Sequence, residues 1–172
     1  MELTRILEAI LFVSPKPVTL KVLQKKLEGF AQKDIESALG GLMREYNYSE
    51  RAVEIIQVSG GYQMRTRSDF KDWVKIFARE KDVVLTRSML ETLAVVAYRQ
   101  PVTKAEIDRV RGVDSIRSIK HLLERRLIEM AGRDGEIGLQ MTFRTTNRFL
   151  EAYSLNDIRD LPTLKEIEAL KE

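Results

Sequence analysis

The sequence contains no cysteine and only one histidine among its 172 residues. Without cysteine the chain cannot form disulfides, offer a thiolate nucleophile or hold zinc through sulfur. The lone imidazole, His121, leaves a metal site or a histidine-dependent triad without the partners that such sites require. We therefore predict that the chain is not an enzyme and uses no cofactor, metal or small-molecule substrate, and that His121 lies on an exposed helix face.

Long apolar runs are also missing, since no stretch approaches the roughly 20 residues of a membrane-spanning helix. The first residues, Met1 to Arg5, do not form a charged leader followed by an apolar core. These features predict a cytoplasmic chain with no membrane contact.

Charge is almost balanced, with 29 basic and 26 acidic residues. The sequence pI of about 9.1 favours a nucleic acid partner only slightly. No stretch forms the basic arm that strong neutralisation of phosphates would need. The interleaved charges instead indicate solvated faces.

Apolar residues recur at helical spacing in three segments of the first half. They predict helices over residues 3–13, from the capping residue Thr19 to about residue 27, and over about 34–48. The period then changes to that of strands, over 53–58 and 62–66, joined through Gly60-Gly61.

Ser68 is placed to cap a fourth helix of this half. One side of that helix carries four apolar side chains: Phe70, Trp73, Val74 and Phe77. Three helices and a hairpin are thus followed by a short apolar helix.

The second half repeats this order. A helix over 85–100, capped by Thr86, ends before Pro101-Val102-Thr103, as the first helix ends before Pro17-Val18-Thr19. Thr103 and Glu106 have capping-box spacing and begin a helix that Gly112 terminates.

A helix over about 115–126 then leads to strands over 127–130 and 139–143, with the turn of this hairpin at Gly132 to Gly135. Arg65-Thr66 with Phe70 also matches Arg144-Thr145 with Phe149, because each phenylalanine follows its arginine by five residues.

Three helices followed by a β-hairpin form the winged-helix plan, in which the second and third helices make the helix-turn-helix. The predicted fold is α+β, mainly α, with two tandem winged-helix domains over 1–81 and 86–153. Residues 81–85 are the predicted linker. An acidic tail, 154–172, carries a break at Leu161-Pro162-Thr163 and a short terminal helix, and we expect it to be loosely held.

A helix-turn-helix raises the question of DNA binding, which depends on the third helix of each domain. In the first domain this helix carries Asp34, Glu36 and Glu45 and offers little to phosphates or bases. In the second domain the third helix contains a basic stretch, which is compatible with a weak contact with DNA phosphates. Its candidate residues are Arg117, Lys120 and Arg125.

Several motifs closely resemble the ScpB family, the segregation and condensation protein B. The longest runs from Leu90 to Ile107 and contains Tyr98-Arg99-Gln100-Pro101-Val102-Thr103, and Arg111-Gly112-Val113-Asp114-Ser115 follows it. Further agreement comes from Ala9 to Ser14, Leu122 to Arg125, Thr145-Thr146 with Phe149-Leu150, and Leu161-Pro162. The chain departs from the pattern in the second wing, where Gly135 to Gly138 and Thr142-Phe143-Arg144 replace the usual residues, and at Arg126, where a glycine is frequent.

This resemblance implies a structural subunit of a bacterial condensin-like complex in chromosome condensation and segregation. Such a protein is nucleoid-associated, dimerises largely through its first domain and binds the kleisin ScpA, through which it reaches the SMC ATPase. DNA is then an indirect or weak partner.

Both halves contain more apolar side chains than one small core can cover. We assign part of this excess to a homodimer surface around Ile6, Ile10 and Val13. A second part is assigned to an ScpA contact in the second domain, at Leu93, Val96, Tyr98 and Arg99. The alternative hypothesis is a winged-helix transcription regulator whose second domain binds operator DNA.

Overall fold

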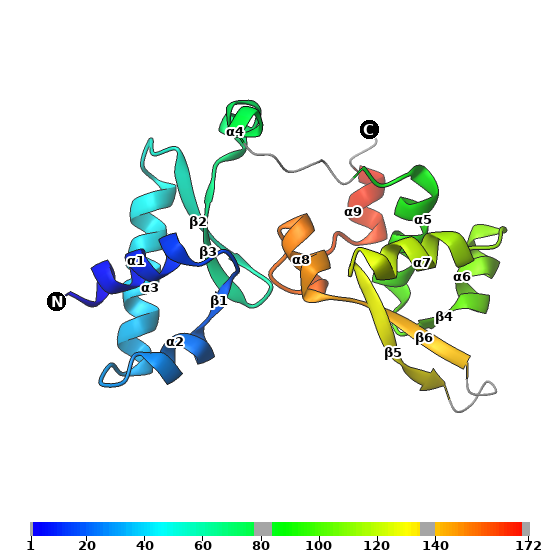
Figure 1. The fold of residues 1–172 in the computed structure, drawn as a ribbon, viewed down its shortest axis with the longest axis horizontal. Helices are drawn as coiled ribbons and strands as arrows, with labels where there is room; N and C mark the ends of the chain where they lie inside the picture. The colour runs from blue at the N-terminus through cyan, green and yellow to red at the C-terminus, as the bar shows by residue number, and fades with distance from the viewer. Residues whose placement is uncertain (1, 78–83, 135–139, 170–172) are drawn as a thin grey trace. The chain divides into compact units, whose positions relative to one another are not determined.

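The computed structural model describes residues 2–77, 84–134 and 140–169, and these divide into two units. The first unit consists of residues 2–77 together with Leu155–Asp157, and the second contains the other described residues up to 169. The predicted linker, 81–85, lies largely outside the described residues. Each unit is described by itself (Figure 1).

The first unit has the element order of a winged helix (Figure 1). Its elements are α1 (Leu3–Val13), β1 (Val18–Thr19), α2 (Leu20–Lys26), α3 (Gln32–Asn47), β2 (Val53–Val58), β3 (Gly61–Thr66), a 3-10 turn (Ser68–Phe70) and α4 (Lys71–Phe77). Strands β1 and β2 both pair antiparallel with β3, which lies between them. Thr19 caps α2 as predicted, its side chain accepting the N–H of Val22 at 3.3 Å.

The core of the first unit lies between α1, α2, α3 and the sheet. Its fully or almost fully buried members are Leu7, Leu11, Leu23, Ile35, Leu39, Leu42, Tyr46 and Ile55. The hydroxyl of Tyr46 donates to the carboxylate of Glu8 and so links α3 to α1. This bond is the first cause that raises the pKa of Tyr46, and burial adds to it.

The hairpin of the first unit turns at Ser59-Gly60 rather than at the predicted Gly60-Gly61. Both turn residues have positive φ, 52° and 69°, as a two-residue hairpin loop requires. Gly61 instead belongs to β3 and pairs with Thr19 and Val58. A Cβ at Gly61 would lie 3.0 Å from the backbone carbon of Val18, so glycine is needed there for the close approach of β1.

The second unit repeats the plan of the first, which confirms the predicted tandem winged-helix fold (Figure 1). Its elements are α5 (Arg87–Arg99), β4 (Val102–Thr103), α6 (Lys104–Arg111), α7 (Ile116–Glu124), β5 (Ile128–Asp134), β6 (Gln140–Thr145), α8 (Asn147–Tyr153), a 3-10 turn (Ile158–Asp160) and α9 (Leu164–Ala169). Strand β6 lies between β4 and β5, as β3 lies between β1 and β2.

The second hairpin differs from the prediction near its tip. Gly132 and Asp134 were expected in the turn, but both belong to β5 and pair with Thr142 and Gln140. A register shift between Met130 and Gly132 accommodates the extra residue, and Gly132 has a φ of 149° there. Residues 135–139, which include the rest of the predicted turn and Leu139 of the predicted strand, lie outside the described residues.

The repeated arginine noticed in the sequence makes the same contact in both units. Nε of Arg65 lies 2.8 Å from Oε1 of Glu54, its partner across the β2–β3 pair. Nε of Arg144 lies 2.8 Å from Oε1 of Glu129, its partner across the β5–β6 pair. The motif therefore marks the base of each wing, where opposite charges face one another across two strands.

The fourth helix of the first unit differs from the prediction at its start, and its apolar side chains are not buried. Ser68 begins a 3-10 turn instead of capping α4, and its side chain contacts only the neighbouring Asp69 in the described structure. None of the apolar side chains of α4 is buried. Trp73 is 70% exposed and Phe77 is 84% exposed.

The described part of the acidic tail is held more firmly than expected. Backbone N–H groups of Ser59 and Gly60 donate to the carbonyls of Leu155 and Asn156 within the first unit, at 2.9 and 3.1 Å. Thr163 begins α9 through a capping box, in which Glu166 accepts the N–H of Thr163 at 2.7 Å. A cap of this kind fixes the first turn of a short helix.

Candidate protein-binding surfaces

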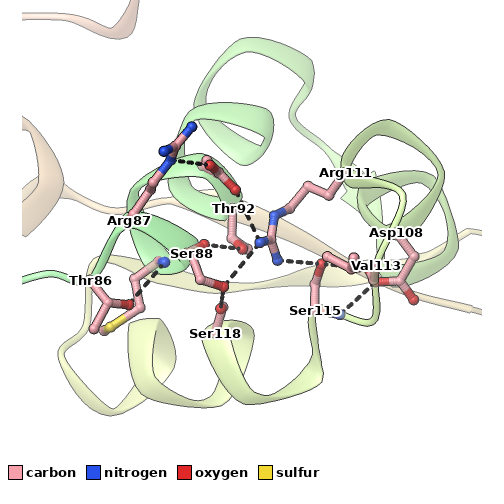
Figure 2. Close-up of polar contacts among 11 residues, drawn as sticks. Thr86, Arg87, Ser88, Thr92, Asp108, Arg111, Val113, Ser115 and Ser118 are labelled. Atoms are coloured by element: carbon pink, nitrogen blue, oxygen red, sulfur yellow. Dashed lines mark hydrogen bonds and ion pairs between the residues drawn. The ribbon is translucent and has the colours of Figure 1, made fainter.

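A polar cluster around a buried guanidinium joins the three helices α5, α6 and α7 (Figure 2). Its centre is the guanidinium of Arg111, whose side chain is only 5% exposed. Nη1 donates to Oγ of Ser115 at 3.0 Å, and Nη2 donates to Oγ of Ser88 at 3.0 Å and to Oε2 of Glu91 at 3.2 Å. Oγ of Ser88 also lies 2.9 Å from Oγ of Ser118 on α7. The cluster therefore ties α5 to both helices of the helix-turn-helix.

A second set of bonds fixes the turn between α6 and α7. Gly112 ends α6 in the left-handed region, with a φ of 70°, and Oδ1 of Asp108 accepts the N–H of Ser115 at 2.8 Å. Nζ of Lys104 lies 2.5 Å from a carboxylate oxygen of Asp108 and 2.5 Å from one of Asp114. Burial raises the pKa of Asp108, but the bonds from Lys104 and Ser115 outweigh it and hold that pKa below its ordinary value.

The carboxylates of Glu91 and Glu106 are held ionised by donors. The hydrogen bond from Arg111, followed by that from Arg87, lowers the pKa of Glu91. Glu106 accepts the backbone N–H of Thr103 at 2.8 Å in the predicted capping box, and this bond lowers its pKa. Such bonded carboxylates stabilise the helix-turn-helix.

The predicted dimer residues of α1 differ in how accessible they are. Val13 is 75% exposed, whereas Ile6 and Ile10 are half-buried and Ile10 packs against the core of its own unit. Phe12, which we did not assign to a surface from the sequence, is 81% exposed. The sequence shows that this segment has an excess of apolar residues, but it does not show that Phe12 is one of the exposed ones.

The four predicted ScpA contacts differ in how accessible they are. Leu93 is 2% exposed and Val96 is fully buried, because both face the core of the second unit. Tyr98 is 44% exposed and Arg99 is also exposed, so these two remain available. The hydroxyl of Tyr98 donates to the carbonyl of Pro162 at 2.7 Å. Leu90, two turns before Tyr98 on α5, is 45% exposed and was not predicted.

The three predicted DNA contacts lie on or next to α7. Arg117 and Lys120 are exposed. Arg125 is half-buried and donates from Nη1 to the carbonyl of His121 at 3.3 Å. His121 is exposed on the same helix, as predicted, and its Nδ1 lies 3.1 Å from Oε2 of Glu124.

Within residues 2–77, 84–134 and 140–169, acidic and histidine side chains form no group suited to hold a metal ion. In the same ranges, no helix is both long and apolar enough to cross a membrane. Exposed apolar and exposed charged side chains lie on helices of both units.

Comparison with known proteins decides the family. The family model described as segregation and condensation complex subunit ScpB matches residues 5–164. The chain belongs to the ScpB family. A segregation and condensation protein B from Syntrophotalea carbinolica is 38% identical over 170 residues, which cover 99% of this chain and 86% of that protein. One from Alkaliphilus oremlandii is 37% identical over 166 residues, covering 96% and 89%.

Solved structures of ScpB are also similar to this chain. ScpB from Mycobacterium tuberculosis is 40% identical, with 90% of this chain and 96% of that one covered and a TM-score of 0.41. A dimer of an ScpB N-terminal domain complexed with ScpA peptide is 18% identical, with 44% and 93% covered and a TM-score of 0.40. ScpB is a subunit of a segregation and condensation complex, so the role of this chain lies in chromosome segregation and condensation.

Proposed function

We propose that this ScpB chain is a non-enzymatic structural subunit of the SMC–ScpA–ScpB complex, and that it forms a homodimer and binds ScpA. The family match across both winged-helix units carries this proposal. The protein works in the cytoplasm at the nucleoid and reaches the SMC ATPase through ScpA. The solved ScpB N-terminal domain that is similar to this chain is itself a dimer with an ScpA peptide.

The first unit supplies the dimer surface in this proposal, at the end of α1. Phe12 and Val13 are adjacent and together expose most of two large apolar side chains. Burying one such side chain contributes about 1.5–3 kcal/mol, and in a symmetric dimer each copy contributes the same surface. Ile6 and Ile10 take part only at the edge of this surface, since both are already half-buried.

The second unit supplies an ScpA contact at the end of α5. The ring of Tyr98 is held by the bond of its hydroxyl to Pro162, so it is ordered before a partner arrives. Arg99 next to it offers a planar fork for a carboxylate, and Leu90 extends the apolar part of the surface. An amphipathic segment of ScpA fits this combination.

The dimer surface is tested by Val13→Asp, measured as molar mass by light scattering after size-exclusion chromatography. The buried charge would break an apolar interface, so we expect a dimer to become a monomer. Val22→Asp is the matched control, because Val22 is 42% exposed on α2 and lies outside the proposed surface. If both variants keep the mass of a dimer, the end of α1 is not the interface.

The ScpA contact is tested by Arg99→Glu and Tyr98→Ala, with affinity for ScpA measured by calorimetry. The control is Arg87→Glu on the same helix, whose side chain is 94% exposed. We expect both test variants to weaken binding at least about tenfold, which corresponds to roughly 1.4 kcal/mol, and the control to leave it unchanged. If the two test variants and the control all bind ScpA as tightly as the unmodified chain, the ScpA contact lies elsewhere. If the unmodified chain itself does not bind ScpA, the proposed function is contradicted.

A further inference from the structure

The third helix of the second unit is the element that would face DNA in a winged-helix protein. Its exposed residues are Ile116, Arg117, Lys120, His121 and Glu124. They lie at the spacing of one helix face, three or four residues apart. The opposite face, with Ile119 and Leu122, is buried in the core of the unit.

The positive charge on this face exceeds the negative charge of its one acid. Arg117 and Lys120 make no ion pair within the described structure. The one carboxylate on the face, that of Glu124, bonds to His121. In the preceding turn, the carboxylate of Asp114 is held by Lys104. Two basic side chains on successive turns are therefore available to an anionic partner.

The equivalent helix of the first unit provides an internal comparison. Exposed Asp34 and Glu36 lie in the first half of α3, and Glu45 near its end pairs with Arg51. Its two exposed basic residues, Lys33 and Arg44, are thus accompanied by acids. Of the two third helices, only α7 presents a surplus of positive charge.

We propose that the exposed face of α7 binds the phosphate backbone of double-stranded DNA without reading its sequence. Arg117 and Lys120 contact phosphates directly. Arg125, half-buried just after the helix with Nη1 bonded to the His121 carbonyl, adds a third contact through its other N–H groups. The exposed face carries neither asparagine nor glutamine, the side chains that read adenine in the major groove. The helix therefore supplies positioning contacts rather than base recognition.

A weak contact of this kind is sufficient for a subunit of a chromosome-bound complex. Sequence-independent binding has a dissociation constant of about 10⁻⁴–10⁻⁶ M at physiological salt. When other subunits already hold the complex on DNA, the local concentration of phosphate is high and a second contact becomes effectively intramolecular. The proposal does not depend on ScpA binding, since it concerns the chain alone.

The test measures the binding of the full chain to a labelled 30-base-pair duplex by fluorescence anisotropy, between 50 and 200 mM salt. Affinity falls with salt by about 0.9 logarithmic units per tenfold change for each phosphate neutralised. Three contacts then predict a loss of about fortyfold over this range. The R117Q/K120Q variant keeps one contact, so its affinity for the duplex should fall only about fourfold over the same range of salt. Thermal unfolding should be nearly unchanged, because both substituted side chains are exposed.

The matched control is K33Q/R44Q, which removes the same charge from α3 and should keep the salt dependence of the unmodified chain. The proposal is wrong if the unmodified chain does not bind the duplex at 50 mM salt, or if R117Q/K120Q has the same salt dependence. It is also wrong if K33Q/R44Q weakens DNA binding as much as R117Q/K120Q does, because the attraction would then come from the overall charge of the chain and not from α7. If R117Q/K120Q instead lowers affinity for ScpA and leaves that for DNA unchanged, the face is a protein contact.

Discussion

Replacing Arg111 by alanine tests whether the polar cluster between α5, α6 and α7 holds the second unit together. The substitution removes two hydrogen bonds to serine hydroxyls, at 3.0 Å each, and one contact with Glu91 at 3.2 Å. Ser115 is fully buried, so water reaches its hydroxyl poorly after the loss, whereas Ser88 is exposed and water can replace the lost bond there. The variant therefore leaves the buried hydroxyl of Ser115 without its charged partner.

The expected decrease in the free energy of unfolding follows from these contacts. A hydrogen bond to a charged group contributes roughly 1.5–3 kcal/mol to the free energy of unfolding, which applies to the bond with buried Ser115. The bond with exposed Ser88 contributes less, roughly 0.5–1.5 kcal/mol. The contact with Glu91 adds little, because 49% of that side chain is exposed and a surface ion pair contributes about 0–1 kcal/mol. Nε of Arg111 has no hydrogen-bond partner in the described structure, and removing this buried group offsets about 1 kcal/mol. We expect a net loss of stability of about 1–4.5 kcal/mol.

Hydrogen exchange followed by mass spectrometry measures this loss where it occurs. A change of 2 kcal/mol corresponds to about thirtyfold faster exchange in peptides from α5, α6 and α7. The control is Arg87→Ala, because Arg87 pairs with the same carboxylate of Glu91 but is 94% exposed, and its cost should stay within about 0.5 kcal/mol. If Arg111→Ala accelerates exchange no more than Arg87→Ala does, the polar cluster around Arg111 does not stabilise the second unit.

Two further predictions concern the same helices. The backbone N–H of Thr103 lowers the pKa of Glu106, so the stability that this bond contributes is present above the ordinary pKa of glutamate, about 4.3, and is lost as pH falls through the lower pKa of the folded state. Glu106→Gln should therefore lower stability at pH 7 and flatten its acid dependence, measured as urea midpoints; an unchanged profile would contradict the capping role. Gly112→Ala should cost about 1 kcal/mol by the same assay, because φ is 70° there although nothing lies within 4 Å of the added Cβ. No loss would show that α6 can end in another conformation.

The fold could be predicted from the sequence because its signals are local. Thr19, Thr86 and Thr103 each accept the predicted backbone N–H at a helix start, and Gly112 ends α6 as expected. The hairpin turns were less predictable. Gly60-Gly61 reads as a turn, but the need for glycine at Gly61 comes from the approach of β1, which is distant in sequence.

The candidate surfaces were only partly predictable, since an apolar pattern does not distinguish a core residue from an exposed one. Leu93 and Val96 share a helix with Tyr98, yet only the packing of the second unit shows that the first two are buried. Arg111 was part of a family motif in the sequence, and its burial depends on serines from two other helices. Contacts of this kind become visible only when the helices are assembled.

The most direct test of the proposed function is the molar mass of the unmodified chain, measured by light scattering with and without ScpA from the same organism. The proposal predicts a mass twice the 19.9 kDa of a single chain, and a stable, heavier complex when ScpA is added. A monomer whose mass does not change with ScpA would contradict it.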